Sequence, residues 1–481
     1  MKLRLCLLAG TVLFSLLAPS VFAQDKKDDK KDKDDDDEIS EITNKDDANF
    51  SIDKLVGGKE VWAMTADQIE KDYKKGGFKW LETGKKDRGI LRPKWMWLRA
   101  ESGGSSSRSI SISSARTSYK LFGDLVSAEE VNFDLKNGTL SALTISIWNK
   151  GDSDEITKAV FQSKITAVST ALGGRLGVKG KDLGKDQGSA SRALRVRWEN
   201  PETVAQLEYS SSEELVNTGV KRQRQFVPEF IRLRLMPKSA VTMRSDAVAN
   251  TAKVSVASLA ARVKKMPNGD VYIDSVPMVD QGDKGYCAVA SSERVMRYYG
   301  IQCDQHDLAQ AAEASAGGTR PSDLEDALHK LQGKFKIRVR DLVKWDERDF
   351  ERLKTAYNRE AGKVGGKLWT PEDYFFEPNV DIFRDARCRN QAYEKFQKMV
   401  VEATNRGIPL LWALRLGLYP ENGEKARQSG GGHMRTMLGY NLKTDELIFS
   451  DSWGAGHEVK RIKGRDAWAA TLGLYLVEPQ N

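Results

Sequence analysis

A cysteine at the start of a predicted helix is the residue of this chain best placed for nucleophilic chemistry. Residues 277–300 read PMVDQGDKGYCAVASSERVMRYYG, and from Cys287 apolar residues recur at helical spacing until Gly300. The unpaired amides and the positive dipole end of a helix N-terminus lower the pKa of a thiol placed there. Free cysteines are often buried structural thiols, so position alone does not separate a nucleophile from a packed side chain.

A histidine and a carboxylate near the C-terminus are the partners that such a thiol needs. His433 lies 146 residues after Cys287, and Asp451 lies 18 residues after His433. A papain-type triad has this order, with later members roughly 130–150 residues downstream of the nucleophile. The strand-like runs 434–440 and 446–450 are separated by turn residues, so we expect paired strands to hold imidazole and carboxylate side by side.

These segments resemble the papain-like cysteine peptidases. Gln281, Gly285 and Cys287 match the Gln…Gly-x-Cys core of that family, and Asp-Ser-Trp-Gly at 451–454 is similar to its Asn-Ser-Trp-Gly motif. The aspartate, the Tyr-Cys-Ala-Val-Ala-Ser run and the following Tyr-Tyr-Gly are more similar to the C39-like branch of bacterial papain-like peptidases. The resemblance covers roughly residues 268–480 and implies a papain-like α+β domain that acts on a protein or peptide substrate without cofactor or metal.

The resemblance also implies a role for each residue. Cys287 would attack a carbonyl as the thiolate, His433 would transfer the proton, and Asp451 would fix the imidazole tautomer. Gln281 would donate a side-chain N–H to the oxyanion, beside the Cys287 backbone N–H. Trp453 would shield the His–Asp hydrogen bond, although a plain core tryptophan fits its position equally well. Because papain relatives use asparagine at position 451, an Asp-to-Asn change is expected to leave partial activity.

Two neighbours of the nucleophile depart from the papain pattern. Lys284 and Ala288 stand where papain has a cysteine before the nucleophile and an aromatic residue after it. Gly285, by contrast, keeps the family residue and is expected to lie against the substrate. The departures separate this chain from the papain subfamily and leave the Cys-His-Asp arrangement intact.

The N-terminus has the pattern of a secretory signal. Residues 1–23 contain Lys2 and Arg4, an apolar run over 5–17 and the small-residue end Val-Phe-Ala. This run is too short and wrongly flanked for a membrane span. No other stretch approaches the roughly 20 apolar residues that a spanning helix needs. We therefore expect a secreted or periplasmic protein without a transmembrane segment.

Charge is distributed unevenly along the chain. Residues 24–49 hold six Lys against twelve Asp plus Glu, a composition that predicts disorder. The whole chain carries +8, residues 1–23 carry +2 and residues 24–49 carry −6, so residues 50–481 carry +12. A basic exported protein can associate with anionic cell-surface polymers. No dense Lys/Arg patch is interleaved with aromatic residues, so we do not expect nucleic acid as a partner.

Residues 50–237 are predicted to form a first α+β domain. They contain no His or Cys, which argues against a second hydrolytic site. This domain could mask the peptidase site as a prodomain, or it could bind or scaffold, and its β-rich pattern favours the second interpretation. The expected elements are helices at 66–80 and 156–172 and strands at 109–113, 129–135, 140–148, 192–199, 203–210 and 230–235, with an Asn137-Gly138 hairpin turn.

A connecting helix and the second domain complete the chain. Residues 238–268, rich in Ala, Ser and Val, are predicted to form a linker helix that ends at a Pro-Asn-Gly turn. Residues 269–481 are the predicted peptidase domain, with a segment at 333–378 that the pattern does not classify. Its other expected elements are a strand at 270–273, helices at 304–314, 321–331 and 390–406, and a buried strand at 409–414.

Two other thiols remain after removal of the signal. If Cys287 stays free as the nucleophile, Cys303 and Cys388 are the only pair that an oxidising compartment could bridge, and two unpaired buried thiols are the alternative. His306 lies three residues after Cys303, but no second pair completes a metal site. We expect His306 to be a surface or helix-cap residue.

Two other functions fit the same residues. One is an amidase or acyltransferase that uses the same triad, for instance on peptidoglycan peptides. The other is a non-catalytic papain-like binding protein in which the first domain carries the function. The presence of Cys, His, Asp and Gln together counts against the non-catalytic protein, whereas only substrate profiling would separate an amidase or acyltransferase from a peptidase.

Overall fold

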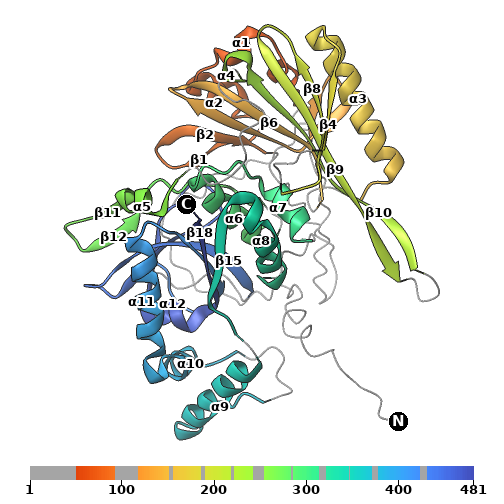
Figure 1. The fold of residues 1–481 in the computed structure, drawn as a ribbon. Helices are drawn as coiled ribbons and strands as arrows, with labels where there is room; N and C mark the ends of the chain where they lie inside the picture. The colour runs from red at the N-terminus through yellow and green to blue at the C-terminus, as the bar shows by residue number, and fades with distance from the viewer. Residues whose placement is uncertain are drawn as a thin grey trace, which may run out of the picture.

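The computed structural model describes residues 50–92, 118–150, 155–185, 190–217, 222–241, 254–282, 285–313, 321–345, 347–370, 377–422 and 431–480. The predicted signal peptide, the Asp/Lys-rich segment and the strand expected at 109–113 lie outside these residues. Within them the fold mixes α and β structure, with one large sheet in each half of the chain (Figure 1). Among the described residues, no helix is long and apolar enough to cross a membrane.

The N-terminal half is built on an antiparallel sheet with strand order β1-β2-β5-β6-β10-β9-β8-β7. Helix α3 covers it and buries one stripe of residues spaced three and four apart, among them Phe161, Val168 and Leu172. Thr157 caps this helix through its side chain, and Gly177 ends it with a φ of 66°. The bounds are β1 (Phe78–Glu82), β2 (Lys85–Leu91), β5 (Glu130–Lys136), β6 (Thr139–Asn149), β7 (Lys181–Lys185), β8 (Leu194–Glu199), β9 (Thr203–Asn217), β10 (Arg222–Pro237), the separate ribbon β3 (Tyr119–Leu121) and β4 (Val126–Ala128), η2 (Asp53–Leu55), α1 (Lys59–Trp62), α2 (Ala66–Tyr73) and α3 (Lys158–Leu176).

Most predicted elements of this half are present. The Asn137-Gly138 hairpin joins β5 to β6, and both turn residues have positive φ, as a two-residue hairpin turn requires. The short helix expected in the segment 66–80, ending at its glycine pair, is α2, which ends at Tyr73 just before that pair, and β1 begins at Phe78 after it.

In its described residues, 238–241 and 254–268, the segment predicted as a linker helix is not one continuous helix. The described part of this segment contains α4 (Lys238–Val241), α5 (Val256–Leu259), η3 (Ala260–Arg262) and strand β11 (Val263–Lys265). Strand β11 pairs antiparallel with β12 (Asp270–Ile273), so the Ala- and Val-rich composition that predicted helix is overridden at this end by sheet pairing.

The C-terminal half holds the second sheet, with order β11-β12-β15-β14-β18-β13 and β16 and β17 continuing beyond β15. Its core includes the fully buried Trp412 and Phe449, whose rings meet at 5.4 Å. Burial of one such large side chain contributes about 1.5–3 kcal/mol. The further bounds are β13 (Ile337–Val343), β14 (Leu410–Arg415), β15 (Gly432–Asn441), β16 (Glu446–Ser450), β17 (Lys460–Lys463), β18 (Thr471–Pro479), α6 (Cys287–Tyr298), α7 (Gln305–Ala311), α8 (Pro321–Phe335), α9 (Glu347–Lys363), α10 (Val380–Arg387), η4 (Arg389–Gln391), α11 (Ala392–Asn405) and α12 (Gly464–Ala470).

Helices therefore come first in this half and most strands come late, as the papain-like resemblance implied. The segment that the sequence pattern did not classify contains the edge strand β13, which pairs with β18, and the amphipathic helix α9. Helix α6 packs against β15, and this contact joins the nucleophile to the strand that carries His433.

Candidate active site

Helix α6, which carries the candidate nucleophile, begins at Cys287, as the sequence predicted. Helix α6 is deeply buried from Ala288 to Met296, whereas Cys287 itself is partly exposed at its first position. The Ser291 hydroxyl donates to the Met434 carbonyl oxygen at 3.2 Å, which ties the helix to β15 one residue beyond His433. The fold thus holds the thiol at a helix N-terminus, where the dipole favours the thiolate.

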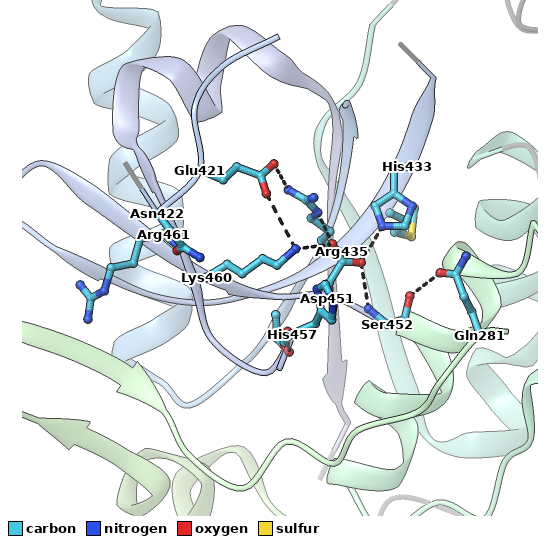
Figure 2. Close-up of polar contacts among 12 residues, drawn as sticks. Gln281, Glu421, Asn422, His433, Arg435, Asp451, Ser452, His457, Lys460 and Arg461 are labelled. Atoms are coloured by element: carbon cyan, nitrogen blue, oxygen red, sulfur yellow. Dashed lines mark hydrogen bonds and ion pairs between the residues drawn. The ribbon is translucent and has the colours of Figure 1, made fainter. Parts of the chain in front are cut away.

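The paired strands β15 and β16 bring His433 and Asp451 together. Thr436 lies opposite Ser450 in the pairing, so the segment just after β16 returns toward the start of β15. The imidazole Nε2 lies 2.6 Å from Asp451 Oδ1, and both side chains are buried (Figure 2). The expectation that a hairpin holds these two groups side by side agrees with this geometry.

The Cys287 thiol and the His433 imidazole are hydrogen-bonded to each other, and each changes the pKa of the other. Burial raises the pKa of Cys287, but the hydrogen bond to His433, the imidazolium charge and the Met434 backbone outweigh it, so the net pKa is lowered. Burial lowers the pKa of His433, but the Asp451 carboxylate and the thiol raise it to about 9. Both shifts favour a thiolate–imidazolium pair near neutral pH.

Asp451 is surrounded by cations that the sequence analysis did not identify. Its Oδ2 accepts from Arg435 Nε at 2.8 Å and lies 3.7 Å from Lys460 Nζ (Figure 2). Its backbone oxygen accepts from Arg294 Nη1 at 2.8 Å. Burial raises the pKa of the Asp451 carboxyl, but the His433 and Arg435 charges outweigh it and hold that pKa well below its usual range. The carboxylate is therefore ionised throughout the neutral pH range and stays so where the imidazole loses its proton.

Arg435 is the most informative of these cations because its side chain is fully buried. Its Nη1 donates to Glu421 at 2.6 Å, and its guanidinium lies 4.6 Å from the Phe449 ring centroid. The sequence held one signal for this ion pair, an arginine inside the apolar strand 434–440, two residues after the candidate base His433. A buried arginine needs an anion, and Asp451 was the nearest candidate in the motif.

Trp453 covers the imidazole. Its ring stacks on His433 at 4.8 Å with 25° between the planes, and Lys460 Nζ lies 4.6 Å from its centroid. The His457 ring meets the Trp453 ring edge-on, with 5.3 Å between the two ring centroids. This stacking is compatible with the shielding of the His433–Asp451 hydrogen bond that the resemblance implied, and that role stays a prediction.

Gln281 is held by the segment that follows Asp451. Its backbone N–H donates to the Ser452 carbonyl at 2.8 Å, and Ser452 Oγ donates to its Oε1 at 2.6 Å (Figure 2). Because the carboxamide oxygen accepts from Ser452, the amide Nε2 is oriented away from that contact. Gly285 lies in the loop between Gln281 and α6, and its contact with substrate stays a prediction.

The remaining histidines and thiols are less favourable for chemistry. His306 is buried in α7 with its ring 5.7 Å from that of Tyr286, so the expected surface position is wrong, although Asp304 does cap this helix. Cys303 and Cys388 are both free, so the suggested bridge is not formed in this structure.

One group of possible metal ligands occurs among the described residues. Glu325, His329 and Asp341 offer ligand atoms within 4.8 Å of one another. The Lys344 ammonium pairs with Glu325 at 2.6 Å and lies 3.6 Å from Asp341, so it already offsets part of their negative charge. We assign no metal to this group.

Comparison with known proteins places the C-terminal region in a family. Residues 273–474 match the model of the Peptidase_C39 like family. No curated protein matches the chain at a significant level. Among solved structures, the chain is similar to the peptidase domain of Streptococcus ComA, a bifunctional ABC transporter involved in a quorum sensing pathway. That likeness has 14% identity and a TM-score of 0.22, and it covers 43% of this chain and 100% of that domain. The family match makes residues 273–474 a C39-like, papain-like region.

Proposed function

We propose that this protein is a cysteine peptidase that hydrolyses peptide bonds through Cys287, His433 and Asp451. The observation that carries the proposal is the continuous chain of contacts from the thiol to the imidazole and from His433 Nε2 to Asp451 Oδ1 at 2.6 Å. A histidine with a carboxylate on one nitrogen and a thiol on the other is the arrangement that activates a cysteine nucleophile. The family match supports the same reaction class.

The chemistry follows from these positions. The Cys287 thiolate attacks the carbonyl carbon of the scissile bond, and the His433 imidazolium then gives its proton to the leaving amine. Water, deprotonated by the neutral imidazole, hydrolyses the resulting thioester and regenerates the thiol. Gln281 Nε2 and the Cys287 backbone N–H are the donors that we assign to the oxyanion in both tetrahedral intermediates.

Other acyl-transfer reactions would use the same groups. An amidase or acyltransferase acting on peptidoglycan peptides needs the same thiolate and oxyanion donors and differs in the substrate and in the acceptor. A non-catalytic binding protein needs none of them, and the lowered pKa of Cys287 would then have no role.

A thiol probe and a peptide library test the proposal. We expect iodoacetamide to label Cys287 in preference to Cys303, because the pKa of the buried Cys303 thiol is raised well above its ordinary value. Cys287→Ala should abolish hydrolysis of every library peptide and leave the circular dichroism spectrum unchanged. Equal hydrolysis by mutant and wild type would eliminate the peptidase, and hydrolysis only of cell-wall amides would favour the amidase.

Export and surface association complete the proposal. We infer secretion or periplasmic localisation from the signal pattern of residues 1–23, and attraction to anionic cell-surface polymers from the +12 charge of residues 50–481. Cell fractionation and salt-dependent binding to cell walls would test these two statements.

A further inference from the structure

The first hairpin of the N-terminal domain lies against the active-site loops. We name β1, β2 and Arg92 together, residues 78–92, the docking hairpin. In Figure 1 β1 lies at the border between the N-terminal sheet and the C-terminal half. The hairpin is about 190 residues away in sequence from the loop that carries Gln281, so its contacts with that loop are contacts between domains.

The docking hairpin holds the loop that precedes Gln281. The Met278 N–H donates to Glu82 Oε1 at 2.9 Å, and the Met278 carbonyl accepts from Arg88 Nη1 at 2.5 Å. The Met278 side chain is buried in a small apolar cluster with Leu81 and Ile90. Both backbone groups and the side chain of this residue are therefore fixed by the other domain.

Asp280, directly before Gln281, is held by two cations of the docking hairpin. Lys79 Nζ lies 2.9 Å from its Oδ2 and Arg92 Nη1 lies 3.2 Å from its Oδ1, while only 5% of its side chain is exposed. Burial raises the pKa of Asp280, but Arg92 and Lys79 outweigh it and bring that pKa to about 2. The same carboxylate accepts the Gly282 N–H at 2.9 Å, so it fixes the backbone on both sides of Gln281.

The turn of the docking hairpin contacts the second catalytic loop. The Thr83 hydroxyl accepts the Gly456 N–H at 3.1 Å, and the Thr83 N–H donates to the Glu458 carboxylate. Gly456 and Glu458 lie a few positions after Asp451 and Trp453 in the sequence. One hairpin thus contacts both loops whose relative position sets the Gln281–Ser452 hydrogen bonds.

We propose that the docking hairpin is a positioning element of the active site, which holds the Gln281 loop in place through Lys79 and Arg92 on Asp280. The proposal rests on the proposed peptidase function for its effect on rate, and on the interdomain contacts alone for its effect on the loop. It gives the N-terminal domain a supporting role in catalysis. An oxyanion donor displaced by about 1 Å loses up to about 100-fold in rate, so the position of the loop matters.

The test uses full-length Arg92→Ala, with Lys79→Ala as a milder variant because Lys79 is half exposed, and Arg92→Lys as the conservative rescue. Lys86→Ala is the matched control, since Lys86 lies on β2 and its contacts among the described residues, Asp67, Glu70 and the Trp80 ring, belong to its own domain. Hydrogen exchange is measured on residues 277–282. A fluorogenic peptide selected with the wild-type protein gives kcat and KM, and iodoacetamide gives the reactivity of the thiol.

For Arg92→Ala we expect exchange of residues 277–282 to be faster by about tenfold and kcat to be lower by about 10- to 100-fold. KM and the alkylation rate should stay within about threefold, because Cys287 and His433 do not contact the docking hairpin through these groups. Lys79→Ala should show smaller effects in the same direction, Arg92→Lys should recover part of kcat, and Lys86→Ala should match wild type.

The outcomes separate this inference from the peptidase assignment. Unchanged exchange and unchanged kcat in both Arg92→Ala and Lys79→Ala would overturn the positioning role. A fall in the alkylation rate equal to the fall in kcat would also overturn it, because the defect would then lie in the thiolate–imidazolium pair of Cys287 and His433. Failure of wild type to cleave any peptide would refute the proposed function, while faster exchange in the variants would still support the docking of the loop.

Discussion

Replacing Asp451 by asparagine tests the electrostatics of this site most directly. A His433 pKa of about 9 in place of 6.5 corresponds to roughly 3 kcal/mol of extra stabilisation of the imidazolium. The negative charge of Asp451 and its hydrogen bond to His433 raise this pKa more than the contact with the thiol does. The asparagine variant should therefore lose most of that stabilisation, and its imidazolium should lose its proton at a pH well below 9.

The structure also predicts a more severe defect than the sequence alone. The carboxamide of asparagine can accept from His433 through its oxygen, but its NH2 group would then face Arg435 Nε at the 2.8 Å position where Asp451 Oδ2 now accepts. Two donors would oppose each other, and the buried guanidinium would lose one of its anions. Removing one partner of a buried ion pair typically costs about 3–5 kcal/mol, so the partial activity expected from papain relatives should be further reduced.

Inactivation by an epoxysuccinyl inhibitor provides the assay, because opening the epoxide needs both the thiolate and the imidazolium proton. The rate should rise with pH as Cys287 ionises and fall as His433 deprotonates near pH 9. In Asp451→Asn the falling limb should move toward pH 7, and urea unfolding should show a loss of about 3–5 kcal/mol. Asp385→Asn, an exposed carboxylate of α10, is the control and should change neither.

A falling limb that stays near pH 9 in Asp451→Asn would refute this reasoning, because another group would then set the pKa of His433. A normal pH profile with unchanged stability would also show that Arg435 does not depend on the carboxylate. The double variant Asp451→Asn/Arg435→Met separates the two effects. It should recover stability by removing the opposed donors, without returning the falling limb to pH 9.

Three further predictions follow from individual residues. Gln281→Ala should lower kcat by about 100- to 1000-fold with little change in KM, because its donor acts mainly in the transition state; a change confined to KM would assign Gln281 to substrate binding. Gly454→Ala should lower the unfolding free energy by about 1–3 kcal/mol, since its φ is +83° and a Cβ would lie 3.0 Å from Asp280 Oδ2; an unchanged urea midpoint would contradict this. Protein recovered from the exported fraction should begin at Gln24, and N-terminal sequencing that finds Met1 there would contradict the signal cleavage.

The sequence indicated those parts of the site that depend on residue type and order. Cys287 was located by a helical apolar pattern, and His433 and Asp451 by two short strand-like runs joined by turn residues. These signals are local, because a helix start and a hairpin turn are determined by neighbouring residues. The geometry of the three groups is accordingly close to what the sequence led us to expect.

The sequence did not indicate the parts that depend on distant pairing. The 238–268 segment has a helical composition, yet β11 forms within it because β12 is available as a partner. The contacts of Arg92 and Lys79 with Asp280 join positions about 190–200 residues apart, and no periodicity records them. The sequence pattern predicts that residues 50–237 form a domain. Only the structure shows which of its residues contact the Gln281 loop and the segment after Asp451.

The cations around Asp451 give a physical reason for an aspartate at this position. The thiolate and imidazolium cancel each other, which leaves the carboxylates of Asp451 and Glu421 facing the cations of Arg435 and Lys460. Glu421 lies 2.6 Å from Arg435 and 3.9 Å from Lys460, so the two carboxylates share one largely buried cluster with these two cations, and Arg294 lies beside it on the Asp451 backbone oxygen. An asparagine would remove one negative charge from a cluster in which water screens the cations poorly. Arg435 and Asp451 therefore require each other, and the carboxylate that holds the His433 imidazole is itself held by an arginine of β15, the strand that carries His433.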